Sequence, residues 1–90
     1  MTENIKDLTI DQFLHSLTVV QFDAALYGRH PDHDRLANEL IEEMGKHFSD
    51  EEFNSLKPDD ILPENVAVSF YKFEEVATDY ATRERRKRGW

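Results

Sequence analysis

A six-residue pattern that can start a helix occurs three times in this chain, and it constrains the fold more than any other feature. The copies read LTIDQF at residues 8–13, LTVVQF at residues 17–22 and FSDEEF at residues 48–53. A Ser or Thr at a helix N-cap accepts a hydrogen bond from a first-turn N–H, and a Gln or Glu three residues later binds the cap's own N–H. Apolar residues flank each copy, so the sequence predicts helices that start at Thr9, Thr18 and Ser49.

The first two copies are nine residues apart, which leaves two alternatives for residues 9–28. The segment forms either two short helices with a bend near Thr18 or one continuous helix. We favour the bend, because a second complete capping box would serve no purpose inside a helix. Gly28 is expected to end this section as a C-cap, where glycine is the preferred residue.

Helical periodicity predicts a second long helix over residues 32–48. Its apolar residues form one stripe at helical spacing: Leu36, Leu40, Ile41, Met44 and Phe48. A short helix is expected from Ser49 to about residue 57, where Pro58 ends it. Residues 57–65, KPDDILPEN, contain two prolines and predict a turn-rich connector.

The last element is predicted to be a helix that starts near Pro63 and ends near Arg88. Residues 66–73, VAVSFYKF, have the β-branched and aromatic composition of a strand, which is the alternative. Helix is favoured because an apolar stripe continues without a turn signal through Val66, Phe70, Phe73, Val76, Ala77 and Tyr80. Opposite charges also lie four residues apart on the predicted helices: Arg35–Glu39, Glu42–Lys46, Asp79–Arg83 and Glu84–Arg88.

These elements predict an all-α fold, a small bundle of four to five helices in a single domain. Ninety residues can form one modest core, and 39% hydrophobic with 33% charged residues is an ordinary globular composition. The chain has no cysteine, which excludes disulfides and thiolate sites. No apolar run approaches the roughly 18 residues of a membrane span, so a cytoplasmic protein that does not enter membranes is expected.

Charge divides the chain into two parts. The basic end, residues 83–90, contains RERRKR with five bases and one acid, a net charge of +4 over residues 83–88. The rest carries six bases and eighteen acids, a net charge of −12. We therefore expect residues 1–82 to form a helical domain with an acidic surface and residues 83–90 to form a basic helix end and tail. Most of the surface should repel nucleic acid.

RHPDHDR, residues 29–35, is the segment that most resembles a metal site. His30, Asp32, His33 and Asp34 are nitrogen and oxygen ligand types within five residues. Carboxylates are equally typical of a helix start, where they cap and meet the positive dipole end, and we favour this interpretation. His47 lies fourteen residues after His33, about 21 Å along a continuous helix, and cannot complete the site. His15 is expected at the rim of the core in a structural role.

No catalytic constellation is found in the sequence, and we expect no enzyme, no cofactor and no metal. A nucleophile elbow and a phosphate-binding glycine loop are both missing. Adjacent acids such as Glu42–Glu43 and Glu74–Glu75 point about 100° apart on a helix, whereas catalytic carboxylates must converge across a cleft. These four glutamates are instead candidate partner-binding residues on an acidic surface.

The basic end supports two interpretations. It can be a solvated helix terminus whose cations meet the negative dipole end. It can also be a binding element, in which the final Trp anchors and the cations bind phosphates or an acidic protein: Arg83, Arg85, Arg86, Lys87, Arg88 and Trp90.

The function predicted from the sequence is a small non-enzymatic protein-interaction module. It would be an adaptor, inhibitor or modulator of a larger macromolecular assembly and would present an acidic surface to a basic partner site. The alternative is a nucleic-acid-associated protein that binds through the basic end. Leftover apolar surface on the two long stripes, Leu36–Met44 and Val66–Tyr80, is expected to support a homodimer.

Overall fold

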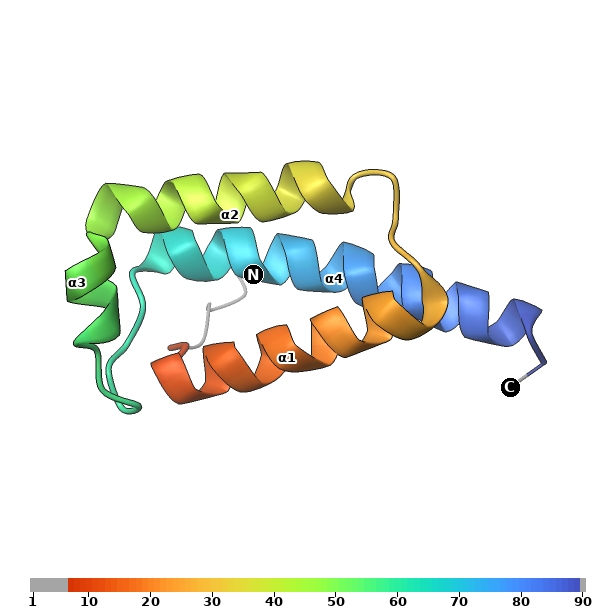
Figure 1. Ribbon diagram of the computed structural model, residues 1–90, viewed down its shortest axis with the longest axis horizontal. Coiled ribbons are helices and arrows are strands. Elements are labelled where there is room, and N and C mark those ends of the chain that lie inside the picture. Colours follow the sequence, from red (N-terminus) through yellow and green to blue (C-terminus); the bar gives the residue numbers. More distant parts are fainter. Residues whose placement is uncertain (1–6, 90) are drawn as a thin grey trace, which may run out of the picture.

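The computed structural model describes residues 7–89, and within them the chain is all-α. The helices are α1 (Ile10–Tyr27), α2 (His33–His47), α3 (Asp50–Asn54) and α4 (Glu64–Lys87). α4 lies between α1 and α2 and packs against both (Figure 1). The predicted small bundle of four to five helices is confirmed. None of the helices in this part of the chain is both long and apolar enough to cross a membrane.

Two of the three predicted capping boxes are present. The Gln12 N–H donates to Thr9 Oγ1 over 3.1 Å, and the Thr9 N–H donates to Gln12 Oε1 over 3.2 Å. At the start of α3 the Glu52 N–H donates to Ser49 Oγ over 3.1 Å and the Ser49 N–H to Glu52 Oε1 over 2.8 Å. The Phe48 and Phe53 rings lie 6.2 Å apart across that cap. Local sequence therefore sets both helix starts.

The predicted bend at Thr18 is wrong, because α1 continues through it. The Thr18 hydroxyl donates to the Leu14 carbonyl over 2.8 Å, the usual bond of a threonine inside a helix. Phe13 and Val20, two turns apart, are both buried against α4, and this common face requires one continuous helix. Gly28 is the C-cap as predicted, with φ +96° and its N–H on the Ala24 carbonyl.

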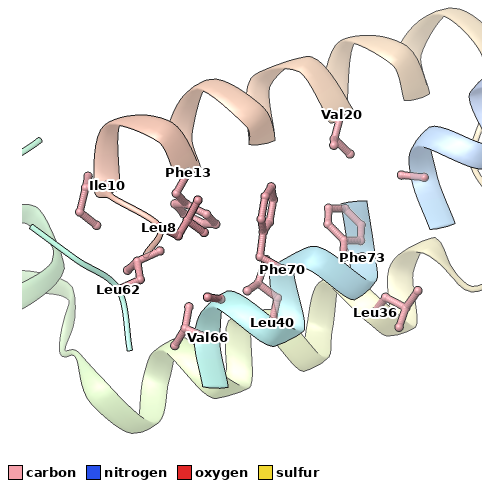
Figure 2. Packing of buried hydrophobic residues seen from close by; sticks show 12 residues of the cluster. Leu8, Ile10, Phe13, Val20, Leu36, Leu40, Leu62, Val66, Phe70 and Phe73 are labelled. Atoms are coloured by element: carbon pink, nitrogen blue, oxygen red, sulfur yellow. The ribbon is translucent and has the colours of Figure 1, made fainter. Parts of the chain in front are cut away.

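The core forms where α1 and α2 meet α4 (Figure 2). Val66 and Phe70 of α4 are fully enclosed, and Phe70 meets Phe13 edge to face with 5.0 Å between ring centroids. Leu36 and Leu40 of α2 are buried as predicted. Residues 66–73 thus belong to a helix, and within residues 7–89 the β structure is limited to an isolated bridge between Thr9 and Ile61.

The connector between α3 and α4 is bound to the first turn of α1. Leu62 N–H donates to the Leu8 carbonyl, Ile10 N–H to the Asp60 carbonyl and Asp11 N–H to the Pro58 carbonyl, over 2.9–3.1 Å. Leu8 and Leu62 are both buried. The connector therefore closes one end of the core.

Several local expectations need correction. α3 ends at Asn54, not near residue 57. Ile41 is 63% exposed, because it lies about 100° around α2 from the buried Leu40 and turns away from α4. Lys46 pairs with Glu43 rather than with Glu42.

The i, i+4 pairs differ at the end of α4 as well. Lys87 pairs with the Glu84 carboxylate over 3.0 Å, and Arg88 contacts the Leu26 carbonyl instead of Glu84. The predicted pairs Arg35–Glu39 and Asp79–Arg83 are confirmed at 3.0 and 3.1 Å.

Candidate functional site

The side of α1 that faces away from α4 is apolar. Four large side chains there remain between 46% and 63% exposed, and we call them the outer face of α1: Leu14, Val19, Phe22 and Leu26. The opposite side of the same helix is buried in the core through Ile10, Phe13 and Val20. α1 is therefore apolar on both sides, a pattern typical of a helix that is covered on both sides.

Helix geometry explains this arrangement. At 100° per residue, Phe22 points almost directly away from the side of α1 that contacts α4. Asp11 and Asp23 are the charged residues of α1, which contains neither Lys nor Arg in eighteen residues. His15 is exposed on the outward side, so its predicted place at the rim of the core is wrong.

The exposed apolar surface is not where the sequence placed it. Most of the Leu36–Met44 and Val66–Tyr80 stripes is taken up by the core, whereas Met44, Val76 and Tyr80 are half-buried and Ile41 is exposed. The outer face of α1 was missed, although the apolar residues of a single continuous helix over residues 10–27 could have revealed it.

The basic end of α4 is bound to the end of α1. The Arg88 guanidinium donates to the Leu26 carbonyl over 2.8 Å and lies 5.5 Å from the centroid of the Tyr27 ring. A cation at this position satisfies a last-turn carbonyl and meets the negative end of the helix dipole. The contact joins residues 62 apart in the chain and places positive charge beside one end of the outer face.

The other predicted binding residues of the basic end differ in whether they form an ion pair within the chain. Arg83 pairs with Asp79 and Lys87 with Glu84, whereas Arg85 and Arg86 are exposed without a carboxylate partner among residues 7–89. Trp90 lies outside the described residues.

The four candidate glutamates do not form one site. Glu43 accepts from Lys46 and from Asn65 of α4, and the Lys46 hydrogen bond holds the pKa of the Glu43 carboxyl below its ordinary value. Glu42 and Glu75 are exposed on different helices. Glu74 is half-buried, and desolvation raises the pKa of its carboxyl.

The residues of RHPDHDR are engaged in separate contacts. Asp32 is at the N-cap of α2, but its carboxylate pairs with Arg35 over 3.2 Å instead of capping, so that part of the prediction is wrong. Asp34 pairs with Arg29, and the His30 Nδ1 accepts from the Asp32 N–H over 2.9 Å. No group of three metal-ligand side chains converges within residues 7–89.

His33 is the buried polar side chain of this region. It is 9% exposed and meets the Phe73 ring at 4.8 Å between centroids, and its Nδ1 has no hydrogen-bond partner among the described residues. Burial lowers the pKa of the His33 imidazole, the nearby Arg29 charge lowers it further, and Asp34 acts in the opposite sense. The folded chain therefore favours the neutral form of the His33 imidazole.

Several hollows border α2, and two of them are lined by residues named above. One, of about 360 Å³, is lined by apolar side chains of α2 and α3 that include Ile41, Met44 and Phe53. The other, of about 330 Å³, lies between α1 and α2 and is lined by Gln21, His33 and alanines, with the Arg29–Asp34 pair at its edge. Neither lining brings together a nucleophile, a base and a group to orient it.

No protein-family model, curated protein or solved structure matched this chain. What the chain does is inferred from its own surfaces.

Proposed function

We propose that this chain is a small non-enzymatic protein-interaction module, an adaptor, inhibitor or modulator of a larger macromolecular assembly in the cytoplasm. It binds protein through the outer face of α1. The observation that carries the proposal is that four large apolar side chains of one helix are 46–63% exposed although a complete core lies beneath them. Several large apolar side chains left exposed on one helix are a feature of interaction sites on soluble domains.

The energetics support a contact of moderate strength. At roughly 150–200 Å² for a full large side chain, the four residues expose about 350 Å² of apolar surface. Covering that surface yields about 9 kcal/mol at ~25 cal/mol/Å². Association itself costs on the order of 4–15 kcal/mol. The face alone therefore supports reversible binding, and a partner that adds contacts around it binds more tightly.

Acidic groups outside α1 can add an electrostatic contribution to the binding of a partner. Glu42, Glu75 and the acids of α3 are exposed, and the chain without its basic end carries a charge of −12. An acidic surface attracts a basic site on a partner and speeds association. The nucleic-acid alternative is less favoured, because three of the five cations it needs are engaged within the chain.

Capture from a lysate of the source cells tests the proposal. Immobilised wild-type chain is compared with Phe22→Glu and with Ile41→Glu, a matched control because both side chains are 63% exposed. We expect a protein that is retained by wild type and by Ile41→Glu, lost with Phe22→Glu and unaffected by nuclease. Equal retention by both variants, or loss of all capture after nuclease treatment, would contradict the proposal.

A further inference from the structure

We propose that the outer face of α1 is covered by a second copy of this chain, with the two α1 helices antiparallel. The inference rests on the proposed function, because both need this face to bind protein. It adds the identity of the occupant and the direction in which that occupant lies.

The spacing of the exposed residues fits a two-helix seam. His15, Val19, Phe22 and Leu26 follow one another at intervals of four, three and four residues, which is the spacing of a helix-pair interface. A two-fold axis between residues 20 and 21 sets Val19 opposite Phe22 of the second copy and His15 opposite Leu26 of the second copy. Such an interface is self-complementary, as a two-fold dimer requires.

The distribution of charge along α1 indicates whether the two α1 helices are parallel or antiparallel. Asp11 lies on the outward side of the first turn, beside the connector that carries Asp59 and Asp60. Arg88, the C-cap of α4, is fixed at the other end by the Leu26 carbonyl and follows Arg85 and Arg86 of the last turn. The connector to α4 and the end of α4 lie at opposite ends of α1 (Figure 1), so α1 has an acidic end and a basic end.

An antiparallel pair brings unlike ends together. With the axis between residues 20 and 21, Asp11 lies level with residue 30 of the second copy, just beyond Gly28 and beside the Arg88 end. A parallel pair would place Asp11 on Asp11 and Arg88 on Arg88. Like charges brought together oppose association, whereas unlike charges fix orientation.

The size of the face sets the strength of the dimer. Two copies cover about 700 Å² of apolar surface, which is less than the ~1,200–2,000 Å² of a standard stable interface. Each copy also carries a net charge of −8, which opposes approach at low ionic strength. We expect a reversible dimer in the micromolar range, measurable at about 0.15 M salt, where charges more than ~8 Å apart are screened.

Sedimentation equilibrium of the purified chain tests the inference over about 5–500 µM, a range that brackets a micromolar equilibrium. Wild type and Ile41→Glu are expected to shift from monomer to dimer as concentration rises. Phe22→Glu is expected to remain monomeric, with a circular dichroism melt that shows it folded. A wild-type chain that stays monomeric throughout, a Phe22→Glu chain that still dimerises, or an assembly larger than a dimer would overturn the inference.

Asp11→Asn tests the direction. In the antiparallel pair each dimer loses two contacts of ordinary surface ion-pair strength, so dissociation should rise about fivefold. In a parallel pair the same change removes repulsion between the two Asp11 carboxylates, and the dimer should tighten. A tighter Asp11→Asn dimer would therefore overturn the antiparallel arrangement.

Sedimentation and capture from a lysate together distinguish failure of this inference from failure of the proposed function. A chain that is monomeric by sedimentation but captures a protein in a Phe22-dependent way overturns the second copy and leaves the interaction module standing. A dimer that dissociates with Phe22→Glu supports the second copy, even where the lysate yields no captured protein and the wider proposal fails.

Discussion

Two phenylalanines of α1 should respond very differently to the same substitution. Phe13 is 2% exposed and packs edge to face on Phe70, whereas Phe22 is 63% exposed on the other side of the helix. Phe13→Ala should cost about 3–5 kcal/mol of unfolding free energy, because it removes a ring from a closed core and leaves a cavity.

The cost of Phe22→Ala follows from the small part of the ring that the fold covers. Roughly a third of about 200 Å² is buried, which at ~25 cal/mol/Å² gives at most about 1.8 kcal/mol. The better helix propensity of Ala returns about 0.5 kcal/mol. We therefore expect a net loss near 1 kcal/mol, a small fraction of the loss at Phe13.

Urea denaturation followed by circular dichroism checks both values. The measurement is made at a concentration at which sedimentation finds only monomer, so that each melt reports the monomer. A Phe22→Ala loss of about 3 kcal/mol or more would refute the division of α1 into a core side and an outer side. So would equal losses for the two variants.

Three further predictions concern single side chains. Thr9→Ala and Ser49→Ala should each cost about 1 kcal/mol in the same melts, whereas Thr18→Ala should be nearly neutral; a cost at Thr18 as large as at Thr9 would restore the bend. Burial holds the pKa of the His33 imidazole below 6.5, so the unfolded chain takes up a proton that the folded chain refuses, and stability should fall as pH drops below 6.5. Thermal melts between about pH 5.5 and 7.5 should show this fall in wild type and a weaker one in His33→Leu, and parallel profiles would disprove the assignment. Arg88→Ala should cost about 0.5–1 kcal/mol and increase amide exchange at the last turn of α1, and unchanged exchange there would show that the contact does not hold the helix end.

Much of the architecture could be predicted from local sequence. The capping boxes at Thr9 and Ser49, the glycine cap at Gly28 and the start of the last helix near Pro63 depend on neighbours within four residues. Such features act over short distances and are visible in the chain itself. The same local rule failed at Thr18, because packing of Phe13 and Val20 on α4 kept α1 continuous.

The binding surface could not be predicted in the same way. Whether an apolar stripe is buried depends on which helices meet, and the sequence alone does not show that the stripe of α4 would pack against both α2 and α1. The Arg88–Leu26 contact spans 62 residues and is equally invisible in the local pattern. The predicted role of the glutamates and of the basic end as partner-binding residues stays a prediction.

Methyl NMR of the purified chain tests most directly whether the outer face of α1 binds a second copy of the chain. Spectra are recorded from about 5 to 500 µM, over which a micromolar dimer assembles. The account predicts that the methyl signals of Leu14, Val19 and Leu26 shift with concentration. The signals of Ile41 and Val68, which are exposed on α2 and α4, should stay fixed. Signals of α1 that do not move over the whole range, or shifts confined to Ile41 and Val68, would contradict it.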